Sequence, residues 1–363
     1  MREVTPSAVG PTRRLVTAGS LAAAVVALAG CGIRLEDDAP RVPLVPTREP
    51  IPAEDALVRL LGAVQAASVA SLVTTDRFAP LLPPLHARQA TVLHDALRQR
   101  GVPEAALPTA APSPTASATP AGTPGTATPG GTPAPGASAA AARPRRTVTE
   151  VESAVLAAGS GLADAEAELR PVLVALLGQA EAAVLLSGGA GAAVAPTATP
   201  SPTASPTASP SASRSASPSA TPSATQTWSS PAAVAPLVTA VRRATFLLEV
   251  AAARSPKATR TAWLRDITAL QALTADLVTA AGDAAPLPDL AQTLPRPVTT
   301  TAEAATLATE AMSTLLAATG STLRTLTDAD PEAAIAAAPG WVGTVAATAH
   351  RHGIRLTAFP GLA

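Results

Sequence analysis

Cysteine, lysine and aromatic residues are scarce in this sequence, and tyrosine and asparagine are absent. The 363 residues contain one cysteine, three tryptophans, three phenylalanines and one lysine, Lys257. A single cysteine excludes a disulfide within the chain, so a domain exported from the cytoplasm would be held together by packing alone. Large aromatic side chains cannot dominate the core, which must be built mainly from aliphatic residues.

An excess of charge of either sign is also missing. Lysine and arginine together number 26, as do aspartate and glutamate, so the formal net charge is zero and charged residues make up only 14% of the chain. Proteins that attract nucleic acid or an anionic surface carry a basic excess. We therefore expect no nucleic-acid partner.

Small apolar residues are what the sequence has in abundance. Hydrophobic residues make up 47% of the chain but aromatics only 2%, so the apolar content is largely alanine. Alanine has the highest helix propensity, and its small side chain lets helices approach closely. No segment shows the alternating pattern of a β-strand. The sequence therefore predicts an all-α fold.

The first thirty residues have the pattern of an export signal. Arg13 and Arg14 precede an uncharged segment, residues 15–30, that consists mostly of alanine, valine and leucine and ends directly before Cys31. A membrane-spanning helix needs about 20 apolar residues, so this segment is short for a span and suits a cleaved signal peptide. We interpret residues 1–30 as that signal peptide.

The residues around the cysteine also indicate a lipid anchor. Leu28-Ala29-Gly30-Cys31 resembles the lipobox of bacterial lipoproteins. The resemblance implies that a signal peptidase recognises Leu28, Ala29 and Gly30, that the chain is cut before Cys31, and that the Cys31 thiol becomes diacylated. Two acyl chains make a stable anchor. The implied location is the outer face of the cytoplasmic membrane, with the bilayer as a partner through Cys31.

The export route is not decided by the sequence. The segment from Thr12 to Val16, which contains Arg13 and Arg14, resembles a twin-arginine signal, which implies export of a folded protein. The stronger apolar residues and the lysine that usually follow the arginine pair are missing. Twin-arginine export and ordinary secretion both stay open.

Proline, threonine, serine and alanine dominate two long segments, residues 108–146 and 191–231. Such compositions bury too little apolar surface to offset the entropy of ordering, so we expect disordered linkers. Exported segments of this kind are often O-glycosylated, and the sequence leaves open whether these are. A shorter proline-rich segment, residues 31–52, predicts a semi-rigid tether after the lipid.

Between these segments apolar residues recur at helical spacing. We expect two helices in residues 53–107 and two more in residues 147–190, which together would form a first bundle. A second helical bundle is expected in residues 232–353, followed by a tail, residues 354–363. The prediction is one or two four-helix bundles separated by linkers.

Several helix ends are marked by specific residues. Thr147 with Glu150, and Thr300 with Glu303, have the spacing of capping boxes. A proline inside a helix removes a backbone hydrogen bond and crowds the preceding turn. Pro339, which is followed by glycine, therefore predicts a kink or a break in the last helix.

One predicted helix carries a family resemblance. The segment LHARQATVLHDALRQRGVP, Leu85 to Pro103, together with the helix order, resembles ferritin-like domains of unknown function in actinobacterial exported proteins. The resemblance implies that the first four helices form a ferritin-like bundle, in which a long connection joins the second helix to the third. It leaves open whether residues 232–353 are a related copy.

The metal chemistry of ferritin-like bundles does not transfer to this chain. Di-metal sites of that family use Glu-x-x-His on two helices, and no Glu-x-x-His occurs here. His86 and His94, eight residues apart on one predicted helix, are the remaining weak metal candidates. Two imidazoles alone make a poor metal site, so we interpret them as a solvated or core-edge pair and expect no metal and no cofactor.

The other polar and aromatic candidates have ordinary structural interpretations. The acidic residues between Asp164 and Glu168 are interpreted as a solvated helix face, and His350 to His352 as a polar helix end whose side chains splay apart. Trp263 fits an apolar stripe and is interpreted as core. Trp228, Trp263 and Trp341 could alternatively line a ligand groove between helices.

No catalytic motif stands out, and we expect that the protein is not an enzyme. The sequence has no Gly-x-Ser-x-Gly motif and no glycine-rich phosphate loop, and its only thiol is predicted to be acylated. The leading hypothesis is a membrane-anchored lipoprotein with a non-enzymatic binding or envelope-structural role. Two alternatives stay open: a degenerate ferritin-like metal-handling protein or enzyme, and a module that binds a small apolar ligand or lipid.

Overall fold

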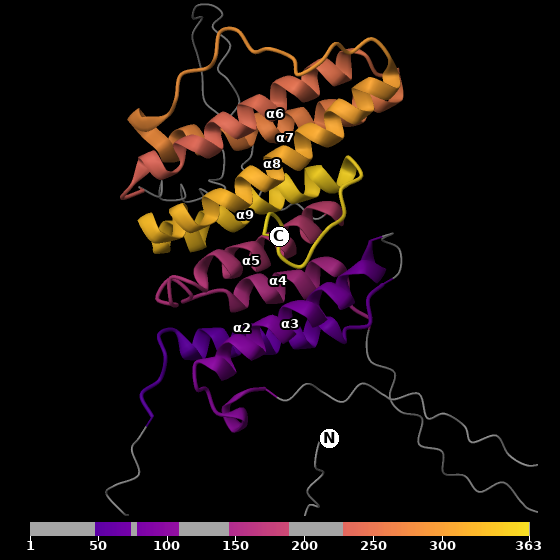
Figure 1. Cartoon of the computed structure of the whole chain (residues 1–363). Helices are drawn as coiled ribbons and strands as arrows, with labels where there is room; N and C mark the ends of the chain where they lie inside the picture. Colours follow the sequence, from indigo (N-terminus) through magenta and orange to yellow (C-terminus); the bar gives the residue numbers. More distant parts are fainter. Residues whose placement is uncertain (1–47, 74–77, 109–144, 189–227, 363) are drawn as a thin grey trace, which may run out of the picture. The chain divides into compact units, whose positions relative to one another are not determined.

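The computed structural model describes residues 48–73, 78–108, 145–188 and 228–362. These residues form eight α-helices and no strand, apart from an isolated bridge between Leu72 and Arg146 (Figure 1). The predicted all-α class is confirmed. The described residues from Pro50 onward belong to one compact unit. None of the described helices is long and apolar enough to cross a membrane.

The first four helices pack around an aliphatic core. They are α2 (Glu54–Ser68), α3 (Leu82–Gln99), α4 (Val148–Ala158) and α5 (Arg170–Leu186). Helix α2 packs against α3 and α4, and α4 packs against α5. Leucine, valine and alanine side chains fill the space between them, among them Leu57, Leu60, Leu61, Val64, Leu93, Leu97, Val151, Val155, Leu173 and Leu176.

The remaining four helices are longer. They are α6 (Ala235–Ala253), α7 (Lys257–Ala281), α8 (Thr301–Ala329) and α9 (Pro331–Arg351). Helix α6 packs against both α7 and α8, and α8 packs against α9. Their shared core again consists mostly of aliphatic side chains, among them Leu237, Val241, Leu248, Leu270, Leu277, Leu307, Leu315, Leu323 and Val345.

Helices α5 and α9 join the two halves of this unit, and Figure 1 shows them side by side. Their backbones approach closely because each contributes a glycine to the contact. A Cβ atom on Gly178 would collide with the side chain of Val342, and one on Gly343 would collide with that of Glu181. The two helical groups expected from the sequence are therefore packed against each other within residues 50–363.

Both predicted capping boxes are present. Thr147 accepts a hydrogen bond from the backbone N–H of Glu150, whose carboxylate accepts from the Thr147 N–H, and Thr300 and Glu303 repeat the arrangement. At the start of α9, Asp330 Oδ1 accepts from the N–H of Ala333 at 3.0 Å. These bonds satisfy N–H groups that the first helical turn leaves without a partner.

The predicted break at Pro339 is absent, because α9 runs continuously from Pro331 to Arg351. A proline at this position removes one backbone hydrogen bond, at a cost of about 3 kcal/mol. Tertiary packing offsets that cost, because Ala338 and Val342, on either side of the proline, are buried in the core with at most 1% of their surface exposed. The burial of this segment keeps the helix intact.

The residues expected as a C-terminal tail are instead packed as far as residue 362. Ala358 is buried, and the Gly361 backbone lies so close to α8 that a Cβ atom on Gly320 would overlap the Gly361 carbonyl. Gly361 has a φ of +82°, which favours glycine. Two residues expected in linkers, Arg146 and Trp228, also belong to the packed structure, through the bridge to Leu72 and by burial.

Candidate functional site

The residues predicted for export and anchoring lie outside the described part of the chain. They are Arg13, Arg14, Leu28, Ala29, Gly30 and Cys31. Most of both predicted linkers also lies outside it. These assignments stay predictions, and the candidate sites below come from residues 50–362.

A buried polar cluster lies among α3, α4 and α5. His86 and Gln89 on α3, Glu152 on α4 and Gln179 on α5 are each at most 1% exposed. His86 Nε2 lies 2.9 Å from Glu152 Oε1, and His86 Nδ1 lies 2.9 Å from Gln89 Oε1. Gln89 Nε2 donates to Gln179 Oε1 at 2.9 Å and to the carbonyl of Ala358 at 2.7 Å. The cluster thus connects three helices and the C-terminal segment.

The hydrogen bonds determine where His86 carries its protons. The carbonyl of Ala358 can only accept, so the Gln89 amide nitrogen faces it and Gln89 Oε1 faces the imidazole. His86 Nδ1 therefore bears a hydrogen. Burial alone lowers the pKa of His86, but the hydrogen bond and charge of Glu152, helped by Gln89, together raise it above 6.5. Below that raised pKa the two side chains form a buried imidazolium–carboxylate pair.

The two histidines considered from the sequence lie in different environments. His94 has a side chain that is 26% exposed, and its Nε2 lies 3.3 Å from Glu104 Oε1, whereas His86 is enclosed. Within the part of the chain that the structure describes, no group of three or more His, Cys, Asp or Glu residues could hold a metal ion. Glu152 Oε2 and Gln179 Nε2 have no hydrogen-bond partner in the buried cluster.

A second polar cluster joins the end of α9 to α7. Asp266, which is 3% exposed, accepts a hydrogen bond from Arg351 Nε at 2.6 Å, and its other carboxylate oxygen lies 3.1 Å from His352 Nε2. The His352 ring is 5.3 Å from that of Trp263. The interpretation of residues 350–352 as a splayed polar end was therefore incomplete, because two of the three side chains meet on one carboxylate.

The other sequence candidates are engaged in packing or ion pairs. Trp228 and Trp341 stack at 5.3 Å between ring centroids and are both buried, so they do not line an open groove. The prediction that Asp164, Glu166 and Glu168 lie on a helix face is wrong, because they lie in the turns between α4 and α5. Arg100, the residue directly after α3, has its Nε 2.5 Å from Glu166 Oε2 and its Nη2 3.8 Å from Glu168 Oε2.

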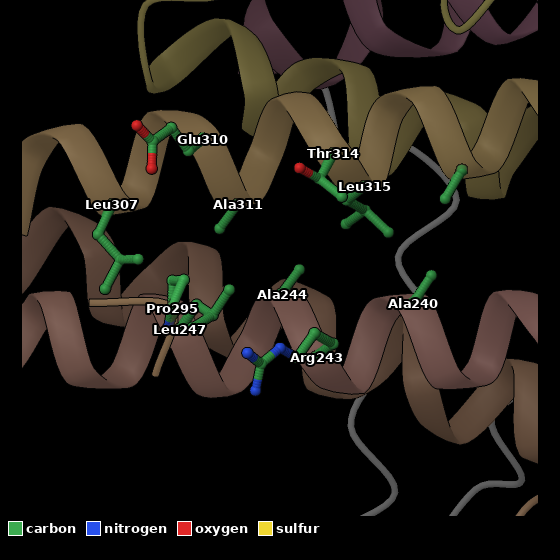
Figure 2. Close-up of a pocket in the computed structure, with 11 residues that line it drawn as sticks. Ala240, Arg243, Ala244, Leu247, Pro295, Leu307, Glu310, Ala311, Thr314 and Leu315 are labelled. Carbon is green, nitrogen blue, oxygen red and sulfur yellow. The ribbon is translucent and has the colours of Figure 1, made fainter. Parts of the chain in front are cut away.

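An apolar groove of about 270 Å³ lies between α6 and α8 (Figure 2). In Figure 2 the short side chain of Ala244 on α6 points toward α8, where Ala311 and Leu315 lie opposite it. The groove is lined by Ala240, Arg243, Ala244, Leu247, Pro295, Leu307, Glu310, Ala311, Thr314, Leu315 and Ala318. Most of this lining cannot form hydrogen bonds through its side chains, so it suits an apolar occupant.

The two charged residues of the groove are already paired. Arg243 Nη2 donates to the carbonyl of Thr293 at 2.5 Å, and its Cζ lies 5.7 Å from the Phe246 ring centroid. Glu310 accepts from Arg296 Nη1 at 3.1 Å, and Arg296 Nη2 lies 2.9 Å from its second oxygen. Arg296 therefore neutralises Glu310, whereas the Arg243 guanidinium is held, within the described residues, only by neutral acceptors, the Thr293 carbonyl and the Gln292 side chain.

The groove results from alanine at helical spacing on two facing helices. On α6 the lining residues follow an i, i+3, i+4, i+7 pattern, and those on α8 continue the same pattern over three turns. Four of the lining residues are alanines, and their short side chains leave this space unfilled. The alanine repeat is visible in the sequence, but which helix faces it is not.

No protein-family model matches the chain, and no curated protein or solved structure matches it significantly. The candidate sites are therefore interpreted from their own geometry.

Proposed function

We propose that this protein is a membrane-anchored lipoprotein with a non-enzymatic binding role, and that the groove between α6 and α8 holds an uncharged apolar molecule. The anchor would be the diacylated Cys31 that the lipobox resemblance implies. The observation that carries the binding role is the groove itself, an apolar space between two helices whose charged neighbours are paired with other protein groups.

The dimensions of the groove narrow the class of ligand. Its volume of about 270 Å³ is just below the range of roughly 300–1,000 Å³ that is usual for small-molecule sites. A space of this size fits one segment of an acyl or isoprenoid chain better than a whole phospholipid. An apolar ligand also suits a protein held at a membrane, where such molecules are concentrated.

A ferritin-like arrangement of α2 to α5 is part of the same proposal. It is supported by the helix order and by the long connection between α3 and α4, which would correspond to the crossover of that family. The helices would then serve as a scaffold without the family's di-metal centre. Metal analysis of the purified protein tests this part, because stoichiometric iron or manganese would favour the metal-handling alternative.

A pair of neighbouring alanines on α8 provides the test of the binding role. Ala318 lines the groove and is half-buried, whereas Ala317 is exposed and does not line it. Leucine at position 318 would occupy part of the space, and leucine at position 317 would extend into solvent. Both substitutions keep a good helix former.

The assay is equilibrium titration of the purified protein with a neutral, environment-sensitive dye such as Nile red. Ala318→Leu is expected to weaken dye binding about tenfold or more, equivalent to about 1.4 kcal/mol. Ala317→Leu is expected to bind like the unchanged protein. Equal affinity in all three proteins would refute binding in this groove.

A further inference from the structure

The loop between α7 and α8, residues 285–300, exposes two leucines almost completely. Leu287 is 88% exposed and Leu290 is 104% exposed, and Leu294 in the same loop is 38% exposed. Leucine is usually buried, because its side chain gains free energy on leaving water. The two leucines lie three positions apart on one loop, with the exposed Asp289 between them, and the rest of the unit does not cover them.

The backbone of this loop is held in place on both sides of the leucines. Arg242 donates to the carbonyl of Pro286 before them, and Arg243 donates to the carbonyl of Thr293 after them. Both arginines lie on α6, and Figure 1 shows the loop passing over that helix. Four prolines in the loop, at positions 286, 288, 295 and 297, further restrict its backbone. The leucines are therefore presented by a fixed segment.

The loop is continuous with the groove. Pro295 belongs to the loop and also lines the groove. Arg243 lines the groove and holds the loop, and Arg296 of the loop pairs with Glu310 at the groove. The two leucines belong to the earlier part of the loop, where Pro288 and Gln292 line a second pocket with residues of α6 and α7. A molecule leaving the groove along this edge would therefore pass Pro295 before it reached the leucines.

We propose that the α7–α8 loop is a membrane-contacting surface, in which Leu287 and Leu290 enter the bilayer interface next to the groove, so that the groove exchanges its apolar ligand with the membrane. This inference rests on the proposed function, because it requires a membrane-held protein with an apolar ligand. A bilayer fits the shape of the surface, since lipid can surround a convex protrusion on all sides without a preformed pocket. It also supplies the class of ligand that the groove fits.

Because Cys31 is the single cysteine of the sequence, an introduced cysteine can carry a fluorescent probe at one chosen position. With Cys31 acylated, Leu290→Cys provides a single reactive thiol for an environment-sensitive fluorophore. Leu264→Cys on α7 is the matched control, because Leu264 is also an exposed leucine, at 51% exposure, but lies outside the loop. The unchanged protein should not label, and labelling of Cys31 would show separately that the anchor proposed above is missing.

The labelled proteins are placed on vesicles of phosphatidylcholine and phosphatidylglycerol that contain a lipid carrying a quencher in its acyl chain. We expect a blue shift and strong quenching for the probe at position 290 and little change for the probe at position 264. Equal quenching at both positions, or none at position 290, would overturn the membrane contact. The latter result would leave a protein partner as the occupant of this surface.

Ligand exchange is tested with the double substitution Leu287→Ser/Leu290→Ser. Both side chains are exposed, so the substitution should leave folding and the equilibrium affinity for Nile red unchanged. Transfer of the dye from vesicles to the protein should slow by on the order of tenfold or more, because the loop loses apolar surface that enters the bilayer. Unchanged transfer in a variant that still binds the dye would refute the loop's role while leaving the groove's role intact.

Discussion

Removal of one partner of the buried pair between His86 and Glu152 should strongly destabilise the protein. Both residues are at most 1% exposed, and among the residues that the structure describes the imidazole is the only group paired with the carboxylate. Breaking such a pair leaves an uncompensated buried charge and costs about 3–5 kcal/mol. His86→Ala also leaves Gln89 Oε1 without its donor, which adds about 1–3 kcal/mol. Domains are stable by only about 5–15 kcal/mol, so the loss is large.

The pair also predicts the sign of a pH dependence. Because the folded pKa of His86 is raised, its contribution to stability is fully present below about pH 6.5 and is lost as the pH rises through the folded pKa. In Glu152→Gln the carboxylate charge that raises this pKa is gone, although the amide oxygen can still accept a hydrogen bond from the imidazole, and burial, the largest effect, lowers the pKa. The variant should therefore lose stability as the pH falls below about 6.5.

The assay is urea unfolding followed by far-ultraviolet circular dichroism, with the midpoint concentration measured between about pH 5 and about pH 8. In the unchanged protein the stabilising contribution of His86 should decrease as the pH rises. In Glu152→Gln, His86 should instead destabilise the protein as the pH falls. His86→Ala should unfold at a clearly lower urea concentration at the acidic end. Parallel pH profiles for the unchanged protein and Glu152→Gln, or a loss below about 1 kcal/mol for His86→Ala, would refute the ion pair.

Two further substitutions test the packing that joins distant segments. Gly320→Ala should destabilise the protein by about 1–3 kcal/mol, because a Cβ atom at position 320 overlaps the Gly361 backbone. The same substitution should increase hydrogen exchange in residues 354–362. Unchanged exchange would contradict the close contact. Asp266→Ala should lower the thermal midpoint and free the end of α9, because Arg351 and His352 lose a shared buried carboxylate. An unchanged midpoint in a calorimetric scan would show that the cluster contributes nothing to stability.

Local features of the fold could be predicted from the sequence. The capping boxes at Thr147 and Thr300 were predictable because both partners lie within one helical turn. Residue identity and spacing are then sufficient, since no tertiary contact is needed. The exception is Pro339, where the local preference for a break is overridden by burial on both sides of the proline.

Contacts between distant segments could not be predicted in this way. The partners His86 and Glu152 are separated by the first proline-rich segment, and Asp266 and Arg351 lie on different helices. Each of these residues reads as a surface residue when only its own helix is considered. The groove presents the same difficulty, because an alanine such as Ala244 is compatible with close packing and with a groove, and the separation of the two helices, which decides between them, is a tertiary property.

Native mass spectrometry of the protein released from membranes, with Ala318→Leu analysed beside it, tests the lipid anchor and the groove together. We expect a chain that begins at Cys31, carries two or more acyl chains and retains one non-covalently bound, uncharged apolar molecule, which the variant loses. A chain without acyl mass, or the same bound molecule in both proteins, would refute a lipid-anchored protein that binds its ligand in this groove.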